Sequence, residues 1–296
     1  MSLQDLISGV LLGGMLGLVA LGFSLVWGIL NIVNLAHAPT IMFGAYIAFF
    51  FFDTLQLDPF ITLPIAMLIM GSFGYLLQRF LINRVIKAPL LITFLLTFGL
   101  EVMLVNLGRL LFTGTQRSVQ TAYDSASFEL WGAQVSYKKL AGLGVALLLT
   151  GLLYLFMSRT RTGNAIRAVG MDLQAARLMG INIAGIYTLT YAISAALAGA
   201  AGVLLSTWNA FTPDDFGQYN IRAFAVVVLG GLGSIPGALI GGLAFGLISE
   251  VVGGLKIGTD LDAFTLSPWK EGILFAALVL VLILRPQGLM GKQGYK

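Results

Sequence analysis

The sequence contains no cysteine, a single histidine and unusually few charged residues. Without cysteine the chain can form no disulfide, no thiolate metal site and no thiol nucleophile. One imidazole, at His37, is too few for a histidine-ligated metal site or a serine–histidine–aspartate triad, so we predict no metal site and no catalytic residue. Lys, Arg, Asp and Glu make up 10% of the 296 residues, whereas an average soluble domain has about 25%. The composition therefore excludes a soluble enzyme, a disordered chain and a nucleic-acid-binding protein.

A phosphate-binding loop is also missing from the chain. The fragment Gly291-Lys292-Gln293 has neither the upstream glycine spacing nor the Ser or Thr that follows the lysine of such a loop. We therefore expect that this chain does not itself hydrolyse a nucleotide.

Apolar residues and glycine make up most of the chain. The nine most apolar residue types make up 58% of the chain, and 37 glycines accompany them. Too few polar residues remain to cover the outside of a soluble fold of this size. The class that remains is an all-α polytopic membrane protein, in which lipid is the solvent for the outer apolar faces.

Charge-free stretches mark the expected membrane spans. A hydrocarbon core of about 30 Å needs roughly 20 helical residues. The first charge-free stretch is long enough for two spans, and the polar interruption before Pro39 separates them. A further block, 223–249, is interrupted by glycines and a proline, which makes about eight hydrophobic segments. The seven predicted full crossings are 6–30, 38–52, 59–78, 89–112, 140–157, 185–208 and 267–284.

Basic residues in the connecting segments indicate the orientation. The segments 79–87, 159–180 and 285–296, the last of which contains Lys292 and Lys296, are rich in Lys or Arg and nearly free of acids. Cytoplasmic loops carry such an excess of positive charge. The opposite loops are mixed or acidic, as at Asp260 and Asp262. We therefore expect an outside N-terminus and a cytoplasmic C-terminus.

This orientation constrains the glycine-rich block 223–249. With seven full crossings, the block must leave the membrane on the side where it enters. Its 27 residues would extend about 40 Å as helix, which is short for two crossings. We predict a broken, re-entrant helical hairpin that turns at 230–236, and two short crossings stay an alternative. The whole chain, 1–296, is expected to form one transmembrane domain with a cytoplasmic loop at 159–184 and an external loop at 113–139.

The loop 159–184 contains signals for two short helices. Asn164 can cap a first turn that Gly170 ends, and Asp172 can cap a second helix that Gly180 ends in the left-handed conformation. A helix this short is unstable alone and must dock on something. One interpretation is an ordinary basic loop folded against its own bundle. The other is a docking helix for a cytoplasmic partner.

Small residues recur at four-residue spacing in several spans. Gly9, Gly13 and Gly17 do so in the first span, and similar pairs lie in 237–246. Such faces let helix backbones approach closely. The pattern favours tight packing within the bundle, with contact between two membrane subunits as the alternative.

Polar residues inside the spans are candidates for a solute path. Glu101 lies in the middle of a span, where a charged side chain is costly. It could form a structural pair with Arg109, two turns further along the helix, or it could line a solute pathway. The irregular backbone between the first two spans would either line a cavity or be a buried structural element. The candidate path residues are Asn31, Asn34, His37, Glu101, Gly230, Gly231 and Gly233.

Several segments together resemble a known family. They are Asn34-Leu-Ala-His37 followed by 42–46, the loop end Leu178-Met-Gly180-Ile-Asn182, the triplet Gln174-Ala-Ala176 six residues before Gly180, the stretch 228–238, and Arg285-Pro-Gln-Gly288-Leu. In this order and spacing they resemble the membrane permease of branched-chain amino-acid ABC importers, the LivH-type subunit, over essentially the whole chain. Ala38 and Gln174 depart from the usual glycine and glutamate of the family.

The resemblance implies a function and partners that composition does not show. It implies a permease subunit of the bacterial cytoplasmic (inner) membrane that translocates branched-chain or related amino acids. Its partners would be a second, LivM-type permease, two cytoplasmic ATPase subunits that carry the ATP and Mg, a periplasmic or lipid-anchored solute-binding protein, and membrane lipid, with no cofactor on this chain and no nucleic acid. The resemblance makes helix 172–179 the coupling helix, with Asp172, Gln174, Ala175, Ala176, Arg177 and Gly180 as the coupling residues.

Other interpretations stay open at this point. The same importer architecture would also serve urea or short amides, and the permease pair could be a homodimer or a heterodimer. An ion-coupled secondary carrier would need ionisable groups along the spans, whereas mid-span charge here is nearly confined to Glu101. A membrane scaffold that transports nothing is the remaining alternative.

Overall fold

The structure of the chain is a computed structural model, and it describes residues 3–121, 123–130, 132–257, 264–265, 267–285 and 287–291. The predicted acidic loop residues Asp260 and Asp262, Pro286 of the last family-like segment, and the tail residues Lys292 and Lys296 lie outside the described residues.

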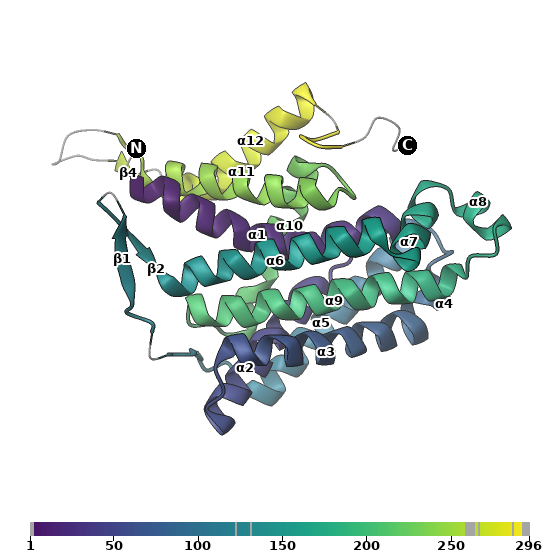
Figure 1. Cartoon of the computed structure of the whole chain (residues 1–296), viewed down its shortest axis with the longest axis horizontal. Coiled ribbons are helices and arrows are strands. Elements are labelled where there is room, and N and C mark those ends of the chain that lie inside the picture. The colour runs from purple at the N-terminus through teal and green to yellow at the C-terminus, as the bar shows by residue number, and fades with distance from the viewer. Residues whose placement is uncertain are drawn as a thin grey trace.

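Helices dominate the described chain, which confirms the predicted all-α class (Figure 1). The described strands form two short antiparallel pairs, β1 (Ser127–Leu130) with β2 (Ala133–Ser136) and β3 (Lys256–Ile257) with β4 (Phe264–Thr265). The helices are α1 (Leu3–Leu30), α2 (His37–Leu55), α3 (Pro59–Leu77), α4 (Asn83–Val85), α5 (Leu90–Phe112), α6 (Tyr137–Arg159), α7 (Arg161–Met171), α8 (Leu173–Leu178), α9 (Ile183–Trp208), α10 (Gly217–Gly230), α11 (Ile235–Gly254) and α12 (Lys270–Leu284). A π-helical turn, Gln78–Ile82, joins α3 to α4, and 3-10 turns lie at Pro213–Phe216 and Ser267–Trp269.

Seven helices in the described part are long and apolar enough to cross a membrane, which supports a multi-pass membrane protein. They are α1, α2, α3 with its continuation to Val85, α5, α6, α9 and α11. This set differs from the predicted crossings, because it includes α11 and not α12. Helix α12 has 15 residues, so it extends only about 22 Å, whereas the 20 residues of α11 extend about 30 Å.

The two ends of the bundle carry different elements (Figure 1). The hairpin of β1 (Ser127–Leu130) and β2 (Ala133–Ser136) lies at one end, which we call the β end. Helices α7 and α8 lie at the opposite end, which we call the α8 end. At the β end the Tyr123 hydroxyl donates to Asp58 Oδ2 over 2.8 Å. Burial, and then this hydrogen bond, raise the pKa of the Tyr123 hydroxyl.

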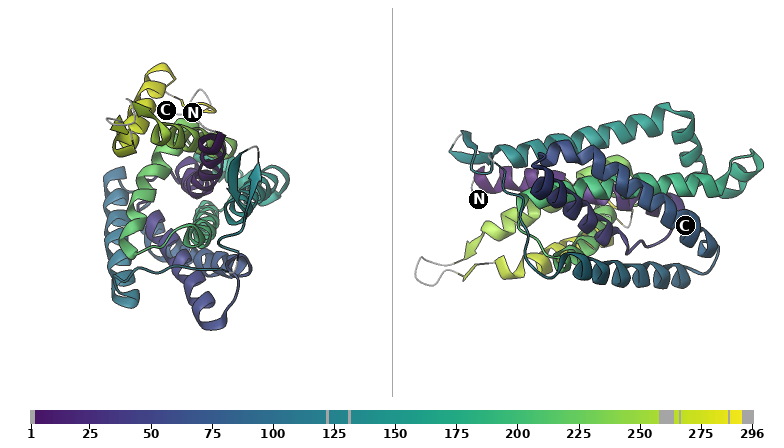
Figure 2. Two further views of the ribbon diagram at one scale, coloured as in Figure 1. Left: turned by 90° about the vertical axis from the view of Figure 1, so that its left-hand side faces the viewer. Right: turned by 90° about the horizontal axis from the view of Figure 1, so that it is seen from below.

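Helix α1 lies inside the bundle, where it packs against α6, α9, α10 and α11 (Figure 2, left). Glycines allow the close approach of α1 to α11. A Cβ added at Gly13 would lie 2.6 Å from the Leu243 Cα, and one added at Gly9 would lie 2.9 Å from the Leu247 Cα. On α11, Cβ atoms at Gly242 and Gly246 would clash with the backbone of α1. The predicted use of these glycines, tight packing within the bundle, is therefore confirmed.

Helices α10 and α11 form a hairpin that turns at the predicted glycines and proline, while its re-entrance into the membrane stays a prediction. Gly231 and Gly233 adopt φ values of +110° and +74°, which residues with a Cβ rarely adopt. The turn lies against Gly28 near the end of α1, while Gly254 at the other end of α11 lies against Asp5. Helix α11 therefore runs along almost the whole length of α1.

Both hairpin helices extend beyond the predicted limits of 223 and 249. Those limits were set by the charges of Arg222 and Glu250, which the structure places inside the helices. Arg222 pairs with Glu271 at 2.6 Å, and Glu250 pairs with Lys270 at 3.2 Å. Because α12 supplies both counter-charges, neither charge needs to end its helix.

Candidate functional site

The break between α1 and α2, residues 31–36, turns the chain back toward the inside of the bundle. Asn31 has a φ of +54°, and its N–H donates to Trp27 O over 3.0 Å, which ends α1. Six residues later, His37 Nε2 lies 2.9 Å from Val19 O. Val19 precedes Leu30 by 11 residues, or about 16 Å of helix. Helix α2 therefore begins beside the middle of α1 and not beside its end. The irregular segment 31–36 lies between other helices.

Two candidate path residues of this break are buried. The Tyr191 hydroxyl of α9 donates to Asn34 Oδ1 over 2.9 Å. His37 contacts the α1 backbone through Nε2 and meets the Phe23 ring edge-on, with 5.8 Å between ring centroids. Both side chains thus connect the start of α2 to α1 and α9, and in this conformation neither is exposed.

Asn220 of α10 connects the break to α5. Its Nδ2 donates to Leu35 O over 2.6 Å and to Glu101 Oε1 over 2.9 Å. Its Oδ1 accepts from the Ala38 N–H at 3.0 Å. Sequence reasoning missed Asn220, since the predicted block began at residue 223. The signal was the polar run 218–222 directly before that block.

Glu101 does not pair with Arg109. The Arg109 guanidinium instead pairs with Asp214 near the β end. Two helical turns, about 11–12 Å, separate the two α5 residues, and Asp214 lies much closer to the guanidinium. Glu101 is only partly buried and accepts its hydrogen bond from Asn220. An ionised carboxylate at this depth costs about 2.5–3.5 kcal/mol if it faces lipid.

The candidate glycines lie elsewhere, at the hairpin turn near the α8 end. Gly230 and Gly231 are buried, and Gly233 is exposed. The Leu289 and Met290 N–H groups donate to Leu229 O and Gly230 O, so the C-terminal segment covers one side of the turn. Asn220 therefore brings Glu101 next to the break that contains Asn34 and His37. Asn31 is exposed at the end of α1, and the three candidate glycines lie apart from Glu101, at the hairpin turn.

The predicted coupling residues lie in and around α8, which is capped as the sequence predicts. Asp172 Oδ1 accepts from the N–H groups of Gln174 (2.8 Å) and Ala175 (3.0 Å). Gly180 follows the helix with a φ of +78°. Ala176 is buried against the chain, whereas Gln174, Ala175 and Arg177 are exposed.

The first helix of this loop differs from the prediction. Thr160, and not Asn164, caps α7, since the Gly163 N–H donates to Thr160 Oγ1 over 2.9 Å. Gly170 does not end the helix either. A Cβ there would lie 3.1 Å from Gly28 O, so the glycine allows α7 to approach the end of α1.

Three large apolar side chains around α8 are almost fully exposed. Met171 is 85% exposed, Leu178 89% and Met179 81%. We call these residues the α8 apolar cluster. Within this chain the buried side chain of α8 is Ala176. An apolar cluster on a short, capped helix is a surface suited to a protein partner.

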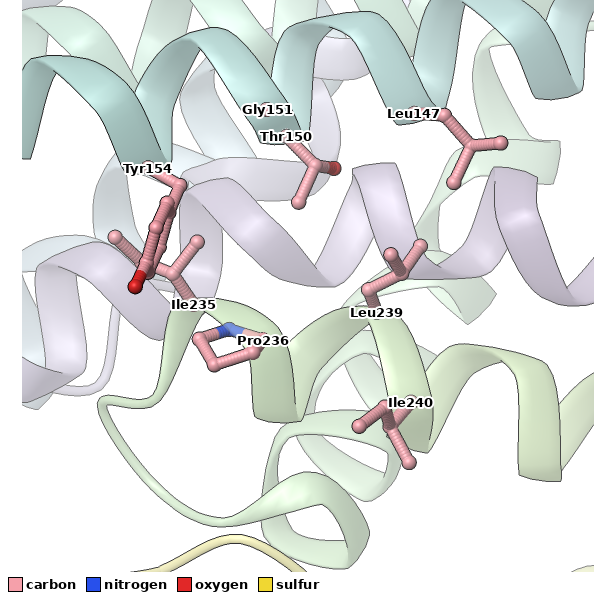
Figure 3. A pocket seen from close by; sticks show the side chains of 8 residues that line it. All are labelled: Leu147, Thr150, Gly151, Tyr154, Ile235, Pro236, Leu239 and Ile240. Carbon is pink, nitrogen blue, oxygen red and sulfur yellow. The ribbon is translucent and has the colours of Figure 1, made fainter.

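Two cavities lie away from the predicted path residues. One cavity of about 370 Å³ lies between α6 and α11 (Figure 3). Its lining is almost wholly apolar, and Tyr154, Thr150 and Leu239 contribute to it. A second, polar cavity of about 220 Å³ lies near the β end, where Asn209, Asp215 and Gln218 are among its lining residues. Among the described residues, no group of three or more His, Asp or Glu side chains could hold a metal ion.

Comparison with known proteins places the chain in a family. The family model for the permease component of the branched-chain amino acid transport system matches residues 6–283. The high-affinity branched-chain amino acid transport system permease protein BraD of Pseudomonas aeruginosa is 33% identical, over 98% of this chain and 96% of the relative. The corresponding LivH protein of Escherichia coli K12 is 31% identical over the same shares. A solved inward-facing ABC transporter of the metal-chelate type is 18% identical, with a TM-score of 0.46, and covers 94% of this chain and 85% of that one.

The chain therefore belongs to the permease-component family of branched-chain amino acid transport systems. It is a multi-pass membrane permease subunit, and the resemblance found in its sequence segments is confirmed.

Proposed function

We propose that this chain is the LivH-type permease of an ATP-driven importer for branched-chain or related amino acids. Family membership over residues 6–283 supports the transport role. The observation that carries the mechanism is the α8 apolar cluster, at one end of a bundle with seven candidate spans. ATP and Mg would be bound on two separate ATPase subunits, where the ATP is hydrolysed, and one of these subunits would dock on this cluster.

The α8 end is the cytoplasmic end in this proposal. Arg159, Arg161, Arg167 and Arg177 lie on or beside α7 and α8, and an excess of basic residues favours the cytoplasmic side. The protein then lies in the bacterial cytoplasmic membrane with its N-terminus outside. The β end would face the solute-binding protein.

A chain of contacts leads from α8 into the bundle. Helix α8 follows α7 directly, and Gly170 of α7 lies against Gly28 of α1. Gly28 also lies against Gly233 at the hairpin turn, and α1 leads into the break at Asn31. Closure of the ATPases on ATP would move α8, and these contacts would transmit the movement to the break and the hairpin.

A second, related permease would cover the outer face of α5. Helix α5 carries many exposed apolar residues, yet Glu101 lies midway along it. Because a carboxylate facing lipid is costly, this region of α5 is better covered by a protein surface that leaves room for water. The solute would pass between the two permeases.

The double variant Leu178→Ser/Met179→Ser tests this function. In proteoliposomes with the complete complex, we expect ATP-driven leucine uptake to fall at least about tenfold, because docking loses its apolar contacts. The ATPase subunits should also fail to copurify. Leu130→Ser, an exposed leucine at the β end, is the matched control and should retain both properties.

Two outcomes would contradict the proposal. Normal uptake by the double variant would show that α8 is not the docking site. Uptake driven by an ion gradient, with the purified chain and no ATPase, would favour the secondary carrier instead.

A further inference from the structure

The carboxylate of Glu101 lies midway along α5, and no cation pairs with it in the part of the chain that the structure describes. Glu101 is the twelfth of the 23 residues of α5, about 16 Å of helix from either end. Among the described residues, no Lys, Arg or His nitrogen lies within 4.0 Å of it. The basic residue of the same helix, Arg109, is engaged by Asp214.

One hydrogen bond holds this carboxylate in place and leaves most of it available. Glu101 Oε1 accepts from Asn220 Nδ2 at 2.9 Å. Asn220 is itself fixed, because it also bonds to Leu35 O and to the Ala38 N–H. A carboxylate has about four acceptor positions. The remaining positions of Glu101 can therefore accept hydrogen bonds from a visiting group.

Aromatic residues lie on the same helix faces as Glu101 and Asn220. On α5, Phe94 and Phe98 precede Glu101 by seven and three residues, so they share its face of the helix. On α10, Phe224 follows Asn220 by four residues and lies on the same side of that helix. Phe98 is 48% exposed and Phe224 is 41% exposed. A negatively charged group on a partly exposed aromatic surface suits a solute with an ammonium group and an apolar body.

We propose that Glu101 is a specificity-determining residue that receives the ammonium group of the solute, while Phe98 and Phe224 contact its apolar side chain. This inference rests on the proposed function, since the solute must pass along α5. It gives a physical reason why a permease of this family would favour amino acids over urea and short amides, which carry no ammonium charge.

The variant Glu101→Gln separates charge from structure. A glutamine Oε1 can still accept from Asn220, so the contacts with the break are retained. In proteoliposomes with the complete complex, we expect leucine uptake to fall at least about tenfold, because a charge-assisted hydrogen bond is lost. Copurification of the other subunits and the ATPase stimulation by loaded binding protein should persist. Glu101→Asp should retain more uptake than Glu101→Gln, and Glu129→Gln, an exposed carboxylate of β1, is the control for removing a carboxylate.

A chemical measurement on the unmodified complex tests the ammonium contact directly. Dicyclohexylcarbodiimide reacts with carboxyl groups at membrane depth, and mass spectrometry reports the labelled fraction of Glu101. We expect L-leucine to slow this labelling several-fold. We expect 4-methylpentanamide, which has the same side chain but no ammonium group, to leave it unchanged at the same concentration.

Each contrary result has its own meaning. Normal uptake by Glu101→Gln would overturn the inference, as would equal protection by leucine and the amide. Loss of the second permease from the Glu101→Gln complex would show that a cation of that partner pairs with the carboxylate, which also overturns it. A wild-type complex without ATP-driven uptake would instead contradict the proposed function.

Discussion

At the scale of residues, single polar side chains connect the irregular break between α1 and α2 to the neighbouring helices. Asn220 uses both amide hydrogens and its oxygen to join the break, α5 and α10. The sequence shows that Glu101 needs a partner, because a mid-span carboxylate is costly. It does not show which partner, since Asn220 lies 119 residues away. The nearest basic residue along the chain, Arg109, was the wrong choice because Asp214 pairs with it.

Gly13→Ala tests the glycine packing between α1 and α11. The new Cβ would lie 2.6 Å from the Leu243 Cα, and backbone atoms cannot move aside cheaply. We expect a loss of about 1–3 kcal/mol of stability from overpacking, seen as a lower melting temperature of the detergent-purified chain.

Gly144→Ala in α6 is the matched control, because nothing lies within 4 Å of its added Cβ. Alanine favours helix over glycine by about 1 kcal/mol, so this variant should melt at the same or a higher temperature. Equal melting temperatures for Gly13→Ala and the wild type would contradict the described contact.

At the scale of elements, capping residues and turn residues correctly predicted where α8 begins and ends and where the α10–α11 hairpin turns. The Asp172 cap and the left-handed Gly180 bound α8 as expected. The turn of the α10–α11 hairpin also lies where glycine and proline place it. The hairpin limits were wrong, because the ion pairs of Arg222 and Glu250 with α12 join segments that are separate in sequence.

Asp172→Ala tests whether the cap maintains α8. The change removes the acceptor for the Gln174 and Ala175 N–H groups, which costs about 1 kcal/mol. A six-residue helix has little stability of its own. We expect faster amide hydrogen exchange in 173–178, and lower uptake by the complete complex, with the melting temperature of the bundle unchanged.

Asp172→Asn is the comparison variant, since the asparagine oxygen still caps a helix. It should retain slow exchange. If Asp172→Ala exchanged as slowly as Asp172→Asn, the cap would not be what holds α8.

At the scale of the whole molecule, the sequence predicted the class and nearly all long helices. Charge-free stretches identify spans because a charged side chain in lipid is costly whatever the fold of the protein. It could not predict that α2 begins inside the length of α1, since the contact of His37 with Val19 depends on how the helices assemble. Nor did it predict that Asn220 brings Glu101 next to the break between α1 and α2.

Single cysteines test the proposed orientation, because the natural chain has none. A membrane-impermeant maleimide, added from the periplasmic side, should label Gln134→Cys in β2. Met179→Cys, beside α8, should be labelled only after the inner membrane is opened. The opposite pattern would invert the orientation and place the α8 apolar cluster outside the cell.

The central claim is that energy reaches this permease through α8. The most direct measurement is cross-linking from Leu178→Cys, the single thiol of the chain, in the assembled complex. We predict a cross-link to an ATPase subunit and protection of this thiol from a water-soluble maleimide, with neither effect at Leu130→Cys. A Leu178→Cys thiol that labels equally fast with and without the ATPase subunits, and forms no cross-link to them, would contradict the account.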